Sequence, residues 1–214
     1  CLEDKQVDKN IKFEDLVRII DDTSCAELES VINEAAIHAA SERKDAIDID
    51  DVTKTVLKRH FGGVEEVSSV SERQLKERAI HEAGHLVVSE VLKDKSVGMA
   101  AVGVDKNGDV GGFVHRCSLF DRRSFEIVGA LAGKAAVELR MGSCPSGCQG
   151  DLEKASNLII DGLNNNATLG LNLLTFGSHV DSEKKLEQTE LIVGSELNRF
   201  MFITKDIILK KMTL

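Results

Sequence analysis

The stretch His81-Glu-Ala-Gly-His85 constrains the fold of this chain most, because its two histidines can act together only on an α-helix. At about 100° per residue, positions four apart lie about 40° from one another around the helix axis, so both imidazoles can face one cation. Glu82 lies one step further round, close to such a cation without having to bind it. A catalytic zinc ion with three protein ligands keeps a fourth position for water, whose proton a neighbouring carboxylate can accept. The pattern H-E-x-x-H is therefore typical of zinc peptidases.

The residues around this motif favour the helix that it requires. Ser71 and Gln74 form a capping-box pattern, and apolar residues recur at helical spacing from Leu75 to Val91. We therefore predict a helix from this cap to about Leu92. Gly84 weakens a helix by roughly 1 kcal/mol relative to alanine, so we expect packing or function to require it. The alternative, a chance match on a helix with surface histidines, is disfavoured by this context.

Composition places the chain among soluble globular proteins of one or two domains. It has 214 residues, of which 42% are hydrophobic and 29% charged. Its formal net charge of -9, without a basic cluster, argues against nucleic acid as a partner. No run of 18 apolar residues occurs and residues 1–10 are polar, so this sequence encodes neither a membrane span nor a signal peptide. We expect any contact with a membrane to involve only parts outside this chain.

Cysteine usage indicates a reducing compartment. The chain has five cysteines, an odd number, and no secretory signal, so we expect free thiols and a cytoplasmic location. Cys144 and Cys148 do not have the C-x-x-C spacing of zinc knuckles or redox sites. Cys25 and Cys117 are expected to be small buried residues.

The N-terminal part of the chain is predicted to form three helices. The first covers residues 13–20, and the second opens with a capping box from Ser24 to Glu27. The third follows Asp50 as its N-cap and stops at Gly62-Gly63. These patterns predict a small helical unit.

The chain is accordingly divided into three parts. Residues 1–62 form the helical unit, residues 63–70 form a linker rich in glycine, glutamate and serine, and residues 71–214 form a second domain. His38 and His60 belong to the first unit, where we expect them on helix surfaces rather than as metal ligands.

The second domain combines helices with one hairpin, so the predicted fold class is mainly α with a small β-sheet. Asn107-Gly108, between two strand-like runs, is a strong hairpin signal. After the motif helix we expect strands over residues 97–104 and 109–117, then helices over residues 124–140, 151–160 and, as one helix or two, 182–209.

A pair of histidines needs a third ligand, and the residues leave several candidates open. Glu138 lies inside a helical pattern and Asp151 opens the next one, so both are stronger candidates than His115 or His179. Two explanations account equally well for the position of Asp151: it is a metal ligand, or its negative charge interacts favourably with the helix dipole. A cation bound by both histidines and by Glu153 instead of Asp151 would reassign the site.

Three motifs in the same order resemble the peptidase domain of the FtsH family of ATP-dependent zinc metalloproteases. They are His81-Glu-Ala-Gly-His85, Leu131-Ala-Gly-Lys-Ala-Ala-Val-Glu-Leu139 with Gly142, and Ser146-Gly-Cys-Gln-Gly-Asp151-Leu-Glu-Lys-Ala155. Upstream, Thr23-Ser-Cys-Ala-Glu-Leu28 and Val31-Ile-Asn-Glu-Ala-Ala36 are similar to the helical lid of the family's AAA+ ATPase module. The resemblance implies an AAA+ lid in residues 1–62 and a helix-rich zinc peptidase domain in residues 71–214.

The resemblance also implies a role for each candidate residue. His81, His85 and Asp151 would be the ligands of a Zn²⁺ ion, and Glu82 would be the general base that activates water at the zinc. Glu138 would be a supporting carboxylate that holds one of the ligands in place.

As a family member, the chain would be the proteolytic C-terminal part of a longer ATP-dependent protease. Its substrates would be proteins or peptides, which would bind as an extended strand beside residues 111–115. It would also assemble with further copies of itself, since family members form hexameric rings. In the full-length protein we expect it at the cytoplasmic face of a membrane. The loop before Asp151 departs from the family, with Cys-Gln-Gly where Ala-Ser-Asn is usual.

Two other functions stay open at this stage. One is a catalytically inactive family member that acts as a binding or assembly module. The other is a soluble helical protein whose motif binds structural zinc or nothing.

Overall fold

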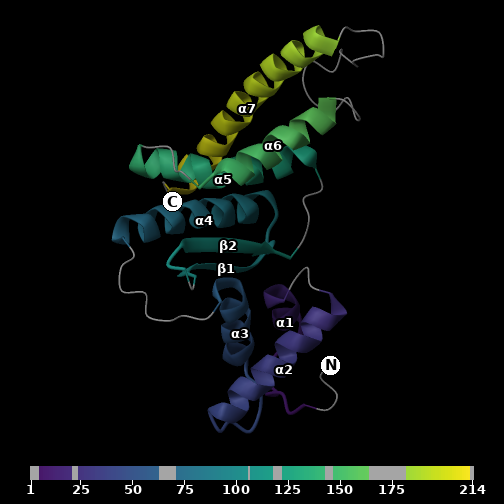
Figure 1. The fold of residues 1–214 in the computed structure, drawn as a ribbon, viewed down its shortest axis with the longest axis vertical. Helices are drawn as coiled ribbons and strands as arrows, with labels where there is room; N and C mark the ends of the chain where they lie inside the picture. The colour runs from purple at the N-terminus through teal and green to yellow at the C-terminus, as the bar shows by residue number, and fades with distance from the viewer. Residues whose placement is uncertain are drawn as a thin grey trace. The chain divides into compact units, whose positions relative to one another are not determined.

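The fold is mainly α-helical with one small sheet, as predicted (Figure 1). The structure is a computed structural model that describes residues 5–20, 24–62, 71–105, 107–117, 122–142, 147–163 and 182–212. No helix in these ranges is both long and apolar enough to cross a membrane. The elements are α1 (Phe13–Ile19), α2 (Cys25–Ser41), α3 (Ile49–Phe61), α4 (Glu72–Leu92), β1 (Val97–Val104), β2 (Val110–Arg116), α5 (Arg123–Met141), α6 (Gln149–Asp161) and α7 (Ser182–Met212).

The chain forms two compact units. The first comprises Cys1–Glu82 and Lys95–Leu119, and the second comprises Ala83–Asp94 and Phe120–Leu214. The division falls inside α4, so this unbroken helix belongs to both. The predicted division into a helical unit, a linker and a second domain stays a prediction, and residues 63–70 lie outside the described part of the chain.

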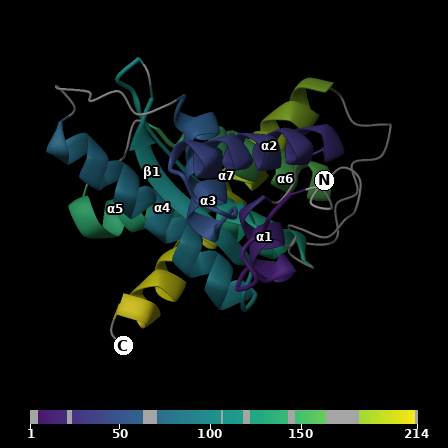
Figure 2. The same ribbon diagram turned by 90° about the horizontal axis from the view of Figure 1, so that it is seen from below.

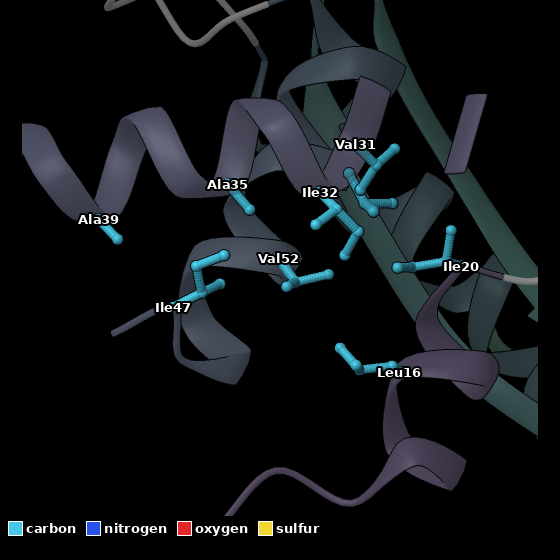
Figure 3. Close-up of a cluster of buried hydrophobic side chains, with 9 residues drawn as sticks. Leu16, Ile20, Val31, Ile32, Ala35, Ala39, Ile47 and Val52 are labelled. Carbon is cyan, nitrogen blue, oxygen red and sulfur yellow. The ribbon is translucent and has the colours of Figure 1, made fainter. Parts of the chain in front are cut away.

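Three helices enclose an apolar core in the first unit. Helices α1, α2 and α3 lie together in both ribbon views (Figures 1 and 2). Their buried aliphatic side chains point toward one another (Figure 3), and each valine, leucine or isoleucine among them stabilises the fold by about 1.5–3 kcal/mol when it is fully removed from water. The buried residues of this core are Leu16, Ile20, Val31, Ile32, Ala35, Ala39, Ile47, Val52 and Val56.

Side-chain caps fix where two of these helices begin. The Ser24 hydroxyl accepts the Glu27 backbone N–H and the Glu27 carboxylate accepts the Ser24 backbone N–H, which confirms the predicted capping box of α2. The prediction of Asp50 as the N-cap of α3 is wrong. The cap is Asp48, because its reciprocal partner Asp51 stands three residues later and completes a second capping box.

Strands β1 and β2 form the predicted hairpin. They pair antiparallel, with Val104 opposite Val110 at the turn. Gly108 has a φ of 87°, a conformation that favours glycine, and the Asp105 carboxylate accepts the backbone N–H groups of Asn107 and Asp109. The sequence signal Asn-Gly and the observed turn therefore agree.

The second unit is built from α5, α6, α7 and the last part of α4. Helix α5 is its most buried element, and it ends at Gly142, which takes the left-handed conformation with a φ of 66°. Helix α7 is one continuous helix, which settles the choice between one and two helices over residues 182–209. Its Thr204 is fully buried, and the hydroxyl donates to the backbone carbonyl of Phe200.

The described cysteines differ in their burial, and only one of them is buried. Cys148 is buried, Cys117 is half-buried and Cys25 is exposed. The expectation of burial is therefore wrong for Cys25, because this residue occupies the first position of α2, where the apolar stripe of the helix has not yet begun.

Candidate metal centre

Helix α4 positions the two histidines of the motif. His81 is 5% exposed and Glu82 is 6% exposed, so this part of the helix faces protein rather than solvent. His85 follows His81 by one turn of the same unbroken helix, which places both rings on one side of it. The predicted helix and its end at Leu92 are confirmed.

Gly84 sits where α4 crosses α5. A β-carbon at this position would lie 2.5 Å from the carbonyl oxygen of Ala132 and 2.6 Å from the β-carbon of Ala136. Ordinary van der Waals contacts of such an atom begin at 3.4 Å, so no side chain fits here without separating the two helices. The glycine inside the motif thus has the packing reason that was expected.

Both ring nitrogens of His85 have partners in the second unit. Nδ1 lies 2.8 Å from the carbonyl oxygen of Gly129 on α5, and Nε2 lies 3.1 Å from Oδ2 of Asp151 on α6. A carbonyl oxygen can only accept a hydrogen bond, so the ring donates its Nδ1–H to Gly129. In the neutral ring Nε2 then carries a lone pair that faces the carboxylate.

The contact between His85 and Asp151 calls for a shared proton or a cation. A lone pair on Nε2 and an ionised carboxylate oxygen 3.1 Å away would both act as acceptors. A proton on the ring, a proton on the carboxyl group or a metal cation makes the contact favourable. A backbone carbonyl that holds the second nitrogen of a histidine is a common support for a metal-ligating ring.

Asp151 reaches this position from the first turn of α6. The helix begins at Gln149, two residues earlier than predicted, and Asp151 lies among the exposed N–H groups that favour a negative charge. Its side chain is 27% exposed, so Asp151 is partly accessible to solvent. The position of Asp151 therefore fits both explanations, because its charge is favoured at the start of α6 and its carboxylate lies close to His85.

His81 completes a group of three possible ligands. The group comprises His81, His85 and Asp151, each of which offers one ligand atom, and these atoms lie within 4.8 Å of one another. Zinc–nitrogen and zinc–oxygen bonds of about 2.0–2.2 Å in a tetrahedral site place neighbouring ligand atoms about 3.3–3.6 Å apart, which small side-chain movements would reach. Their assignment as ligands stays a prediction at this point.

Glu82 is held on two sides within the first unit. Nη1 of Arg78, one turn earlier on α4, lies 3.5 Å from Oε1 of Glu82. On another side, Gly112 of β2 packs so closely that a β-carbon there would lie 2.6 Å from Cγ of Glu82. The carboxylate next to the histidines is therefore buried, paired with a cation and confined.

The other candidate ligands lie in different surroundings. His115 packs against His60 and Phe113 in the first unit, and its Nδ1 is buried without a hydrogen-bond partner. His60 is an exposed residue of α3, as expected, and partial burial of its ring, together with His115, lowers its pKa. Glu153 accepts a hydrogen bond from Gln149 on an exposed face of α6. His179 lies outside the described residues.

Glu138 pairs with lysines. Its Oε1 lies 2.5 Å from Lys134 and its Oε2 lies 2.7 Å from Lys205 on α7. Burial raises the pKa of the Glu138 carboxyl, but the hydrogen bonds from the two lysines outweigh it and hold this pKa below its usual value. Among the described residues, the contacts of Glu138 are with these two lysines, whereas the Gly129 carbonyl holds Nδ1 of His85. A backbone group leaves no signal in a sequence.

A second acidic group, in the first unit, already contains a cation. His38, Glu42 and Asp51 have possible ligand atoms within 4.8 Å of one another. Nζ of Lys44 lies 2.9 Å from Asp51 and 3.1 Å from Glu42, so its ammonium supplies the positive charge. His38 contacts buried Asp51 at 2.7 Å and is thus a structural residue, not a free surface histidine.

Comparison with known proteins points to one family. No family model matches the chain. The ATP-dependent zinc metalloprotease FtsH of Bacillus subtilis is 30% identical over 164 residues, which are 72% of this chain and 25% of that protein. FtsH 1 of Sphaerobacter thermophilus is 32% identical over 162 residues, 72% of this chain and 24% of its own length.

A longer match extends over most of the chain. FtsH of Caldicellulosiruptor bescii is 26% identical over 201 residues, which are 90% of this chain and 31% of that protein. The chain thus spans about a quarter to a third of the length of these curated relatives. On these matches, the chain belongs to the FtsH family, whose members are named ATP-dependent zinc metalloproteases.

Proposed function

We propose that this chain is a zinc-dependent endopeptidase that forms the proteolytic part of a longer ATP-dependent protease. In this proposal His81, His85 and Asp151 hold a Zn²⁺ ion, and Glu82 is the general base. The observation that carries it is the contact of His85 Nε2 with the Asp151 carboxylate at 3.1 Å, with the Nδ1–H committed to Gly129.

The donor set fits zinc. Two imidazole nitrogens and one carboxylate oxygen are a ligand set of catalytic zinc sites, which keep one position open. The Gly129 carbonyl fixes the His85 tautomer that leaves Nε2 available for the metal. The partial exposure of Asp151 supports access from solvent to that open position.

The chemistry assigned to the residues follows from their places. Zinc, when bound, supplies a Lewis acid that polarises the peptide carbonyl and makes water more acidic. Glu82 takes the proton from the attacking water and returns it to the leaving amine. Because Glu82 is 6% exposed, few bulk water molecules can form hydrogen bonds with its carboxylate. Strand β2, which lies against Glu82, would border the cleft that receives an extended substrate.

Further proposals concern the whole protein. Residues 1–62 would serve as an AAA+ lid, the substrates would be proteins or peptides, and the assembly would be a homohexamer. The capping box and buried core of α1, α2 and α3 support a lid that is a stable helical unit. The odd number of cysteines supports a reducing, cytoplasmic location, at the cytoplasmic face of a membrane in the full-length protein.

The test is casein degradation by the zinc-loaded protein and by two matched variants on α4. Glu82→Gln removes the proposed base without removing a ligand, so turnover should fall by about 10²-fold or more while zinc content stays at one ion per chain. Glu77→Gln makes the same chemical change on the same helix, outside the proposed site, and should leave turnover unchanged.

Other outcomes favour the other functions. A protein that holds zinc but degrades nothing, with or without Glu82→Gln, would be the inactive binding or assembly module. A protein that loses only thermal stability when a chelator removes zinc would hold a structural ion. The proposal requires that chelation abolishes turnover and that added zinc restores it.

A further inference from the structure

Gly112 on β2 is the residue of the hairpin that lies against Glu82. A β-carbon at this position would lie 2.6 Å from Cγ, 2.8 Å from Oε1 and 3.0 Å from Cδ of Glu82. All three nearest atoms therefore belong to one side chain. Real β-carbons essentially never come closer than 3.0 Å to such atoms, so any side chain at position 112 must displace either the strand or the carboxylate.

The neighbouring glycine of the same strand faces another part of the unit. A β-carbon at Gly111 would meet only the ring of Phe61, at an ordinary distance of 3.4 Å. This difference follows from the alternation of a strand, in which successive positions point to opposite faces. The close approach to Glu82 is thus a property of position 112 and not of the glycine pair.

Arg78, one turn earlier on α4, contacts the same carboxylate. Its Nη1 lies 3.5 Å from Oε1 of Glu82, the oxygen that Gly112 also approaches. The Glu82 side chain is 8% exposed and therefore has little room for other rotamers. The strand backbone and the guanidinium together limit where the carboxylate can lie.

We propose that Gly112 is a positioning residue, whose missing side chain lets β2 hold the Glu82 carboxylate in the place that proton transfer requires. The proposal rests on the proposed function for its catalytic consequence. Its structural part, the contact between Gly112 and Glu82, does not depend on zinc or on turnover.

A double-mutant cycle in zinc-free protein tests the contact itself. Gly112→Ala should lower the unfolding temperature by about 3 °C or more when Glu82 is present. In a Glu82→Ala background the atoms that clash are gone, so the same change should lower it by clearly less. Gly111→Ala is the matched control, and its effect should be the same in both backgrounds. Equal effects of Gly112→Ala in both backgrounds would overturn the proposal.

Peptide turnover by the zinc-loaded protein tests the consequence. Gly112→Ala should lower kcat by about 10- to 100-fold, because small displacements of a catalytic group are costly, while KM and zinc content stay unchanged. Unchanged kcat at full zinc content would also overturn the proposal. If the wild type bound zinc but cleaved nothing, the proposed function would fail, and the cycle would still decide whether Gly112 confines Glu82.

Discussion

Replacement of Gly84 by alanine should destabilise the protein, although helix propensity alone predicts the opposite. An alanine in a helix interior is favoured over glycine by about 1 kcal/mol. Here the new β-carbon would lie 2.5 Å from the Ala132 carbonyl oxygen, so α4 and α5 would have to move about 0.9 Å apart to reach an ordinary contact of 3.4 Å. Overpacking of this kind costs about 1–3 kcal/mol, more so against a backbone atom, which cannot rotate away.

Against a backbone atom the upper part of that range applies, about 2–3 kcal/mol, so after the gain in propensity the expected net loss in the free energy of unfolding is about 1–2 kcal/mol. For a chain of this size the unfolding temperature should fall by about 2–8 °C. Chemical denaturation of zinc-free protein measures the first quantity and calorimetry the second. Zinc affinity should also fall, because separation of the helices moves His85 away from the Gly129 carbonyl that holds its ring.

Gly194 provides the matched control. It also lies inside a helix, α7, but a β-carbon there would have nothing within 4 Å. Gly194→Ala should therefore stabilise the protein by up to about 1 kcal/mol, the opposite sign. The reasoning is refuted if Gly84→Ala is as stable as the wild type or more stable.

Two further predictions concern charged groups away from the candidate site. The Glu138 pKa is lowered in the folded state, so its pairing with Lys134 and Lys205 stabilises the fold above about pH 4. This stabilisation is lost as the pH falls through the folded pKa. Glu138→Gln should thus cost about 1 kcal/mol at pH 7 and flatten the acid limb of a stability–pH curve; an unchanged limb would speak against it. Asp51→Asn should cost about 2 kcal/mol in urea denaturation, because fully buried Asp51 binds Lys44; a change under about 0.5 kcal/mol would exclude this role.

Local patterns predicted most of the helices and the hairpin. Local sequence is sufficient to predict features that depend on a few adjacent residues. Examples are the Ser24–Glu27 capping box, the Asn107-Gly108 turn and the end of α5 at Gly142. The misplaced cap of α3 shows the limit of this approach. Any aspartate in that acidic stretch can cap a helix, and the reciprocal bond to Asp51 selects Asp48.

The candidate site was predictable only in part. Helical periodicity places His81 beside His85, but the approach of Asp151 depends on how α6 packs, which no local pattern encodes. Glu138 illustrates the same limit. It follows Gly129 by nine residues, about 180° around α5, so it faces away from His85 and toward Lys205 on α7.

X-ray absorption at the zinc edge of the zinc-loaded protein tests the central claim most directly. The account predicts two imidazole nitrogens and a carboxylate oxygen at about 2.0–2.2 Å, with the open position taken by solvent. In Asp151→Ala the two imidazoles should remain, the carboxylate contribution should disappear and zinc affinity should fall. A shell without two imidazoles, or one that Asp151→Ala leaves unchanged, would contradict the assignment of His81, His85 and Asp151 as the metal ligands.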